Sequence, residues 1–528
     1  LQKLTHQPLP VHGPYAISGS LYMADHTSIQ VPELKIVLDR TSINGFIGIE
    51  LEHDQPKLHG NLTANRLNLE RLLAPETLPD NLRKHLSSIG PSRLAFELSN
   101  PLQHPTLNRI DLQTQVEHLA TLNLKGSIKN LLAMTGADLH LAIKGTDLAN
   151  LEEVVGQSIP FKGPYSLSGN LRTTAKKTYH LENLNLTTAR NTLRGRSMIQ
   201  RFDSNTAVSV HLETENISLE ELTGGQNAVL DRLTSKKDLG PLEIEAKAVF
   251  SANGHRLQAL DLVFGKEDFI RMRVNGSMGS LTGMQDMQFD VQASGRNISN
   301  LEPIAGRKIP VLGAWALSGE ISGNAPHNIM LRNLDFMLAG NHFTGRLDLN
   351  LANEYPMVES EISADHFSLA LITLEEIDPF KGIPDLGPLR LAFKLSEAGG
   401  APAITHLDLS LGRESTIAVM LRGSVGNLNP LSEVTLDFSV KSHDLSILND
   451  AYGSGFIKGR PFHVMGRLDD PRLEKITVTS LVASYGDSNL SGTATLDLSV
   501  DRPKFRTILS SGNMDLRPCG TIVDTTAG

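Results

Sequence analysis

Long-range internal repetition is the feature of this sequence that most restricts its fold. The segment Gly13-Pro-Tyr-Ala-Ile-Ser-Gly19 returns 150 residues later as Gly163-Pro-Tyr-Ser-Leu-Ser-Gly169, and again after 150 residues as Gly313-Ala-Trp-Ala-Leu-Ser-Gly319. A weaker fourth copy, Pro461-Phe-His-Val-Met-Gly466, follows after 147 residues. Repetition of this kind predicts one continuous array, in which each unit buries its apolar surface against its neighbours.

A second motif alternates with the first. Gly-Pro pairs at 90–91, 240–241 and 387–388 each open an apolar run, and units of both kinds end in a similar closing motif, such as Leu67-Asn-Leu69 or Thr146-Asp-Leu148. The chain therefore divides into half-repeats of two kinds, A and B. After the tail of a preceding repeat (1–9), their predicted bounds are 10–89 (A1), 90–159 (B1), 160–239 (A2), 240–309 (B2), 310–386 (A3), 387–460 (B3) and 461–528 (A4). Because 1–10 matches 151–160 and 301–310, we expect the chain to be an excerpt of a longer protein.

Most of each half-repeat alternates apolar and polar residues with period two, which is typical of a half-buried strand. Examples are 137–143, 344–351 and 406–411. We count four or five strands in each half-repeat and expect short link helices that begin near Asn68 and Ser218. About thirty strands at ~4.8 Å each predict a mostly β fold: an elongated, curved antiparallel sheet array, apolar on its concave face, with short helices at the rim.

Composition excludes several classes of function. The formal net charge is −9, from 49 basic and 58 acidic residues without a basic cluster, and aromatic residues make up only 5%. This argues against a nucleic-acid partner. The single cysteine, Cys519, excludes an intramolecular disulfide and a cysteine-based metal cluster. No run of about 18 apolar residues predicts a membrane-spanning helix.

No motif predicts an enzyme. The 18 histidines lack metal-ligand spacing, so we expect neither a metal site nor a cofactor. The segment Gly486-Asp-Ser-Asn489 resembles the nucleophile motif of one lipase class, but it occupies the repeat position of Gly340-Asn-His-Phe343. We therefore interpret it as a turn between strands, with no catalytic residue.

The functional signal lies in apolar residues that occupy equivalent repeat positions. Their pattern predicts one apolar lane, lined by Ile36, Ile43, Ile110, Leu112, Leu186, Leu193, Leu260, Leu262, Phe336, Phe343, Leu407 and Leu409. The alternative interpretation is the ordinary core of a closed β-sandwich. By strand alternation, Asp261 and Asp408 should face away from this lane.

The run Gly45…Pro56-Lys-Leu-His-Gly60…Leu67-Asn-Leu69 resembles the pattern of the AsmA/TamB-like family of bacterial envelope proteins. In that pattern a strand containing Gly-Leu is followed by a Pro-x-Leu-x-Gly strand and a Leu-Asp/Asn-Leu motif. The resemblance implies a periplasmic protein, anchored to the inner membrane of a Gram-negative bacterium by one N-terminal helix that this chain lacks. It also implies phospholipid acyl chains as ligands, and an outer-membrane partner.

From the resemblance and the apolar positions together, we expect non-enzymatic phospholipid transfer along an apolar β-groove between the inner and outer membranes, in support of outer-membrane assembly and homeostasis. The alternative is a structural periplasmic scaffold or stalk with a closed, dry core.

Overall fold

The structure is a computed structural model of the whole chain. It describes residues 15–25, 27–38, 41–51, 56–67, 92–101, 104–116, 120–131, 135–151, 163–175, 177–218, 239–302, 308–309, 311–353, 355–368, 373–374, 385–428, 431–449, 458–470, 475–498 and 504–515. Link helices predicted from Asn68 and across 219–221 lie outside these residues. In the described part of the chain, no helix has the length and apolar character needed to span a membrane.

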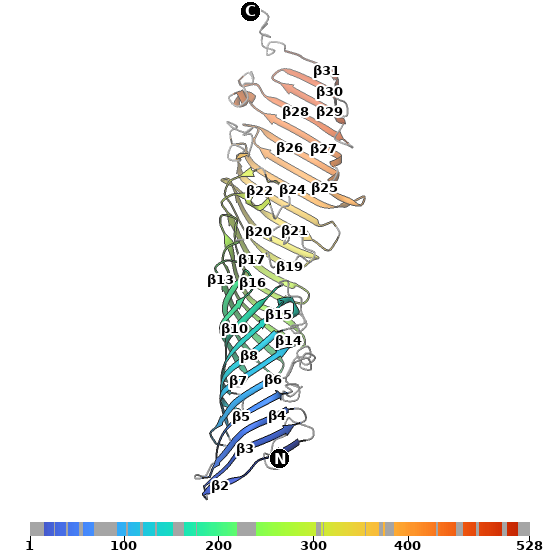
Figure 1. Cartoon of the computed structure of the whole chain (residues 1–528). Helices are drawn as coiled ribbons and strands as arrows, with labels where there is room; N and C mark the ends of the chain where they lie inside the picture. The colour runs from blue at the N-terminus through green and yellow to red at the C-terminus, as the bar shows by residue number, and fades with distance from the viewer. Residues whose placement is uncertain are drawn as a thin grey trace, which may run out of the picture. The chain divides into compact units, whose positions relative to one another are not determined.

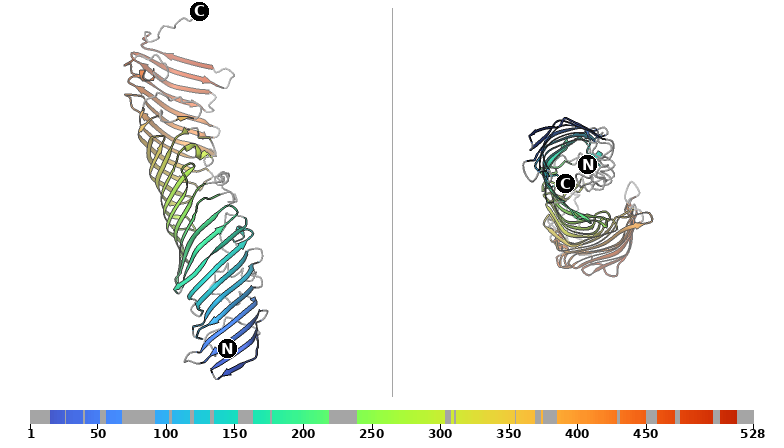
Figure 2. Two further views of the ribbon diagram at one scale, coloured as in Figure 1. Left: turned by 60° about the vertical axis from the view of Figure 1, so that its left-hand side comes forward. Right: turned by 90° about the horizontal axis from the view of Figure 1, so that it is seen from below.

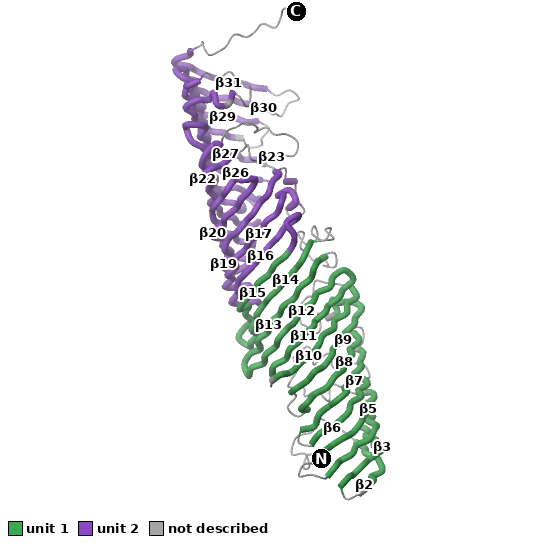
Figure 3. Tube along the Cα trace, turned by 90° about the vertical axis from the view of Figure 1, so that its left-hand side faces the viewer, with its two compact units in different colours: residues 1–264 green, residues 265–528 purple. Residues whose placement is uncertain are grey.

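The protein is mostly β, and 29 strands form an antiparallel sheet that is not closed. The predicted antiparallel β-array is therefore confirmed. The chain divides into two compact units, 1–264 and 265–528 (Figure 3).

Unit 1 contains β1 to β14 and most of β15, and each strand from β3 onward pairs with the next. The bounds of these strands are β1 Tyr15–Ser18, β2 Tyr22–Asp25, β3 Ser28–Leu38, β4 Thr41–Glu50, β5 Lys57–Leu67, β6 Ser92–Ser99, β7 Thr106–Val116, β8 Ala120–Asn130, β9 Thr135–Gly145, β10 Tyr165–Ala175, β11 Thr178–Thr187, β12 Thr192–Arg201, β13 Asn205–Thr214, β14 Leu242–Ser251 and β15 Gly254–Lys266. Strands β1 and β2 both pair with β3, so together they take the place of one interrupted strand.

Unit 2 continues the same pattern from β16 to β31. The bounds are β16 Ile270–Ser280, β17 Gln285–Gly295, β18 Val311–Leu312, β19 Trp315–Asn324, β20 Asn328–Leu338, β21 Asn341–Asn350, β22 Met357–Phe367, β23 Thr373–Leu374, β24 Gly387–Ala398, β25 Ala401–Gly412, β26 Ala418–Leu428, β27 Leu431–Ser442, β28 Phe462–Asp470, β29 Lys475–Tyr485, β30 Ser488–Asp497 and β31 Lys504–Ser510. Strands β18 and β23 form a separate two-stranded ribbon.

Every half-repeat contributes four strands to the sheet, with β1 and β2 counted as one (Figure 1). The predicted strand runs 137–143 and 406–411 lie within β9 and β25, and the run 344–351 lies within β21 except for its last residue, Leu351. Because four antiparallel strands return the chain to its starting side, the chain enters and leaves each half-repeat at the same strand ends, along one long side of the sheet. The residues that flank each link accordingly pair with each other, as Gly145 does with Tyr165 in unit 1 and Gly295 with Trp315 in unit 2.

A glycine lies near the middle of the third strand of every half-repeat. A Cβ atom at this position would overlap a backbone carbonyl oxygen of the fourth strand, as at Gly195 with His211 and at Gly345 with Glu361. All seven glycines share this restriction: Gly45, Gly126, Gly195, Gly276, Gly345, Gly423 and Gly492. The strict repetition of these glycines therefore follows from the close approach of neighbouring strands.

The second strand of the half-repeat bulges opposite this glycine. Between Leu181 and Leu184, β11 carries one residue more than β12, and Leu184 then lies opposite Gly195. The bulge contains Asn183, which adopts a left-handed conformation with φ of 51°. The same bulge recurs on β3, β7, β20, β25 and β29, with a left-handed residue on β7, β20 and β29 (Arg109, Asn333 and Ser480). Bulges bend a strand and increase its twist, and the strands of each unit are visibly bent along their length (Figure 2).

The 3₁₀ helices η2 (Leu148–Leu151), η4 (Ile298–Leu301) and η6 (Leu445–Leu448) each follow the fourth strand of a B half-repeat. Each is preceded by an Asp or Asn whose side chain accepts a hydrogen bond from a backbone N–H two residues later, at 2.9–3.2 Å. Asp147 and Asn297 also accept from the N–H of Gly163 and Gly313 at the start of the next half-repeat. This residue of the closing motif therefore fixes the junction between half-repeats.

Candidate functional site

The two faces of the sheet differ sharply in chemistry. We call the face that carries the seven central glycines the apolar face, and the opposite one the polar face. In unit 1, a row of residues on the apolar face crosses β1 and β3–β15, and successive members are directly opposed except at the bulge between Gly169 and Leu184. Its members are Ile17, Ile36, Ile43, Ala64, Leu94, Leu112, Leu124, Leu141, Gly169, Leu184, Gly195, Leu212, Ile244 and Leu262. No member is polar.

Unit 2 has a corresponding row, which crosses all 14 of its sheet strands. Its members are Val274, Val291, Gly319, Leu334, Gly345, Ile362, Leu391, Leu409, Leu421, Phe438, Gly466, Leu481, Gly492 and Leu509. We call these two series the central rows. Although neighbouring members are up to 32 residues apart in sequence, as Leu212 and Ile244 are, strand pairing places them side by side, with a bulge between Gly319 and Leu334 and another between Gly466 and Leu481.

All twelve predicted lane residues lie on the apolar face. Ile36, Ile43, Leu112 and Leu262 belong to the central row of unit 1, and Leu409 belongs to that of unit 2. Leu186 pairs directly with Leu193, and Phe336 with Phe343. The others, Ile110, Leu260 and Leu407, lie two residues along the strand from a central-row position.

The exposure of these side chains distinguishes two environments. Eleven of the twelve are half-buried, whereas Ile110 is only 6% exposed. Ile110 packs with Ile128, Ala137 and Leu139 in a buried cluster on the apolar face of unit 1. Because all four side chains project from one face, their burial indicates that the sheet bends toward the apolar face here. Among the described residues, the strands form the 29-stranded sheet and the short ribbon of β18 and β23 in unit 2, and no second large sheet faces the first.

Unit 2 has aromatic side chains where unit 1 has aliphatic ones. The ring centroids of Phe336 and Phe343 are 5.9 Å apart, and those of Phe343 and Phe367 are 6.0 Å apart. The equivalent residues of unit 1 are Leu186, Leu193 and Ile217. The apolar face therefore keeps its character while its side-chain volume increases.

The polar face carries cross-strand ion pairs. In unit 2 the Arg422 Nε atom lies 3.1 Å from an Asp408 carboxylate oxygen, and an Arg332 nitrogen lies 2.8 Å from Asp348. Arg346 donates a hydrogen bond to Glu361, and this bond holds the pKa of the Glu361 carboxyl below its ordinary value. Asp408 accordingly faces away from Leu409. Asp261 lies opposite Glu245 on the polar face of unit 1.

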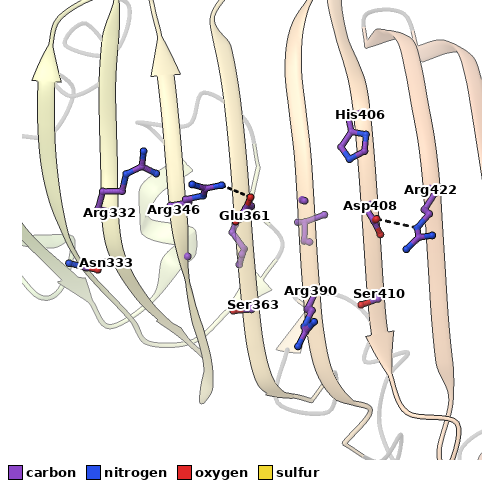
Figure 4. Close-up of a pocket in the computed structure, with 14 residues that line it drawn as sticks. Arg332, Asn333, Arg346, Glu361, Ser363, Arg390, His406, Asp408, Ser410 and Arg422 are labelled. Atoms are coloured by element: carbon purple, nitrogen blue, oxygen red, sulfur yellow. Dashed lines mark hydrogen bonds and ion pairs between the residues drawn. The ribbon is translucent and has the colours of Figure 1, made fainter.

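Sequence reasoning did not find the depression that these polar side chains enclose in unit 2. It spans β20–β22 and β24–β26, has a volume of about 680 Å³, and is lined by four arginines, two carboxylates, a histidine, an asparagine and two serines (Figure 4). Only the register of six strands brings these groups together.

Ser488 has a structural partner. Its hydroxyl accepts a hydrogen bond from the Asp515 N–H at 2.8 Å. At the equivalent positions, the Asn191 side chain forms hydrogen bonds with the backbone of Ser218, and the Asn341 side chain forms them with the backbone of Ser368. In all three cases the partner lies 27 residues later in the chain. Ser488 and Asn489 lie at the start of β30, after the turn at Gly486 and Asp487, as predicted. Among the described residues, no group of three or more His, Cys, Asp or Glu side chains is placed to hold a metal ion.

Comparison of the sequence with models of known families gives no match, and comparison with curated proteins gives no match either.

Proposed function

We propose that this chain binds the acyl chains of phospholipids along its apolar face and conducts them, without enzymatic chemistry, between the inner and outer membranes of a Gram-negative envelope. The observation that carries the proposal is the pair of central rows. Each presents apolar side chains or glycine on 14 successive strands, most of them half-buried.

The physical argument concerns the hydrophobic free energy of a lipid chain in transit. Each CH₂ group exposed to water costs about 0.8 kcal/mol, so a 16-carbon chain costs about 13 kcal/mol. A row without a polar side chain keeps that cost low at every step along the sheet. The polar head group stays in solvent at the open side of the sheet, so a pocket specific for the head group is not required.

The resemblance to the AsmA/TamB-like family supplies the rest of the proposal: a periplasmic location, an inner-membrane anchor in the full-length protein and an outer-membrane partner. The competing proposal is a structural periplasmic stalk with a dry apolar face. It predicts the same strands but no bound lipid.

Lipid mass spectrometry on the purified chain separates the two. Phospholipid that co-purifies with the protein in a fixed ratio, and that competing detergent removes, supports the conduit. Protein that is free of acyl lipid after mild purification, and that takes up none from phospholipid vesicles, favours the stalk.

A further inference from the structure

We propose that the depression on the polar face of unit 2 is a binding site for a phosphate group, centred on Arg390. The site lies on the face opposite the central rows, so this inference does not rest on the proposed lipid function. The phosphate is either free or part of a lipid head group, and the two sources are separated by the test below.

Arg390 differs from the other arginines in the depression. Arg332, Arg346 and Arg422 each form an ion pair with a carboxylate of a neighbouring residue. Among the described residues, Arg390 has no hydrogen-bond or ion-pair partner, and its side chain is exposed. One positive charge of the depression is therefore not neutralised by the protein.

The neighbours of Arg390 suit an oxyanion. Strand pairing places Ser363 directly opposite it on one side and Ser410 on the other, and all three side chains line the depression (Figure 4). A guanidinium group forms paired hydrogen bonds with a phosphate, and hydroxyl groups donate to its remaining oxygens. Two residues further along β24 is Ala392, whose small side chain leaves the depression open between Glu361 and Asp408.

The equivalent surface of half-repeats A2 and B2, in unit 1, has the opposite charge. Glu243 stands at the repeat position of Arg390, Glu213 at that of Ser363 and Glu245 at that of Ala392. The β-fold is the same in both places, so it does not require an arginine at 390. Because half-repeats A2 and B2 form the same strands with acidic residues here, folding does not account for the positive charge of the depression, which points to a ligand.

Half-repeat B1 supplies a matched control. Arg93 and Ala95 occupy the repeat positions of Arg390 and Ala392, and the Lys125–Asp111 pair corresponds to Arg422–Asp408. However, Arg93 pairs with Asn65 and Gln113 instead of two serines, and Phe46 replaces Arg346. Arg93→Gln changes the net charge of the chain as Arg390→Gln does, but leaves the depression intact.

The test is calorimetric titration of the chain with inorganic phosphate at low salt, in parallel with flotation on phosphatidylcholine vesicles with and without phosphatidylglycerol. We expect saturable binding whose Kd rises about tenfold or more in Arg390→Gln, because a charge-assisted pair is lost, and stays unchanged in Arg93→Gln. Ala392→Glu, which introduces the residue that unit 1 carries naturally, should weaken binding equally without touching Arg390.

Binding of inorganic phosphate identifies a free phosphate as ligand. Binding only to vesicles that contain phosphatidylglycerol, lost in Arg390→Gln, identifies the phosphodiester of an anionic lipid head group. Absence of saturable binding to either probe, or equal effects of Arg390→Gln and Arg93→Gln, would overturn the site.

Discussion

The two units use the same apolar face but different polar faces. Gly195 of unit 1 and Gly345 of unit 2 meet the same steric restriction, and Leu184 and Leu334 lie opposite them in the same way. On the other face, Glu243 in unit 1 stands where unit 2 has Arg390. The apolar face is thus determined by requirements common to every half-repeat, whereas the polar face is free to differ. Variants at equivalent positions of the two units test this division.

The largest effect should come from the central glycines. Gly195→Ala and Gly345→Ala should each destabilise their own unit by about 3 kcal/mol or more, because the new Cβ atom overlaps a carbonyl oxygen and the paired strands must separate. Hydrogen exchange of the flanking strands measures this. Gly399→Ala, at a turn with open space around it, is the control and should cost about 1 kcal/mol, from its φ of +60° alone. A small effect at one central glycine and a large one at the other would show that the units are not built alike.

Charge in the central rows should abolish lipid binding in both units. Leu262→Asp and Leu409→Asp place a carboxylate against the acyl chain, and its desolvation costs several kcal/mol. We expect co-purifying lipid to fall strongly while the β-sheet circular dichroism is retained. The controls Asp261→Leu and Asp408→Leu alter the polar face, where loss of the exposed Asp408–Arg422 pair costs at most about 1 kcal/mol. Equal loss of lipid in the controls would contradict a continuous apolar path.

The side chains that join the third strand to the closing motif should matter by an intermediate amount. Asn191→Ala and Asn341→Ala each leave backbone groups of the closing motif without partners and should cost about 1–3 kcal/mol. Ser488→Ala removes one hydrogen bond and should cost about 1 kcal/mol. Urea denaturation followed by site-specific hydrogen exchange gives the comparison. An effect of Ser488→Ala larger than that of Asn341→Ala would assign Ser488 another role.

The smallest effect should be a response to pH near Gly387 in unit 2. Asp385 accepts a hydrogen bond from the Gly387 N–H, which, with His366, lowers the pKa of its carboxyl below the ordinary 3.8. A lowered folded-state pKa stabilises the fold above pH 3.8, and this contribution is lost as the pH falls through the folded-state value. Since Asp385 is largely exposed, we expect a change below about 1 kcal/mol.

In unit 1 the corresponding Gly240 N–H donates a hydrogen bond to the side-chain oxygen of Asn216, and this amide side chain does not titrate. Exchange of the Gly387 amide should therefore accelerate, as the pH falls below 3.8, more than that of the Gly240 amide, after correction for intrinsic rates. Asp385→Asn should remove the difference. A difference that persists in Asp385→Asn would exclude this carboxylate as its source.

Much of the fold could be predicted because repetition and period-two alternation are local. The runs 137–143 and 406–411 lie within β9 and β25, and the apolar positions at Leu262 and Leu409 fall on one face. The bulges left a signal that was not used: Leu181 and Leu184 are three residues apart, which interrupts the alternation. The depression around Arg390 had no local signal, because Ser363 lies 27 residues before it and Ser410 lies 20 after it. Their proximity follows only from the register of β22, β24 and β25.

The even number of strands in each half-repeat has a consequence for how such a protein changes in size. The chain returns to the same long side of the sheet after four strands. Adding or removing one half-repeat therefore keeps every link on that side and every leucine on its face. Gain of a single strand would instead reverse the direction of all that follow. Gene duplication can therefore lengthen the sheet in steps of about 19 Å, four strands at ~4.8 Å each, without redesigning any surface. Length becomes a quantity that selection can adjust independently of chemistry.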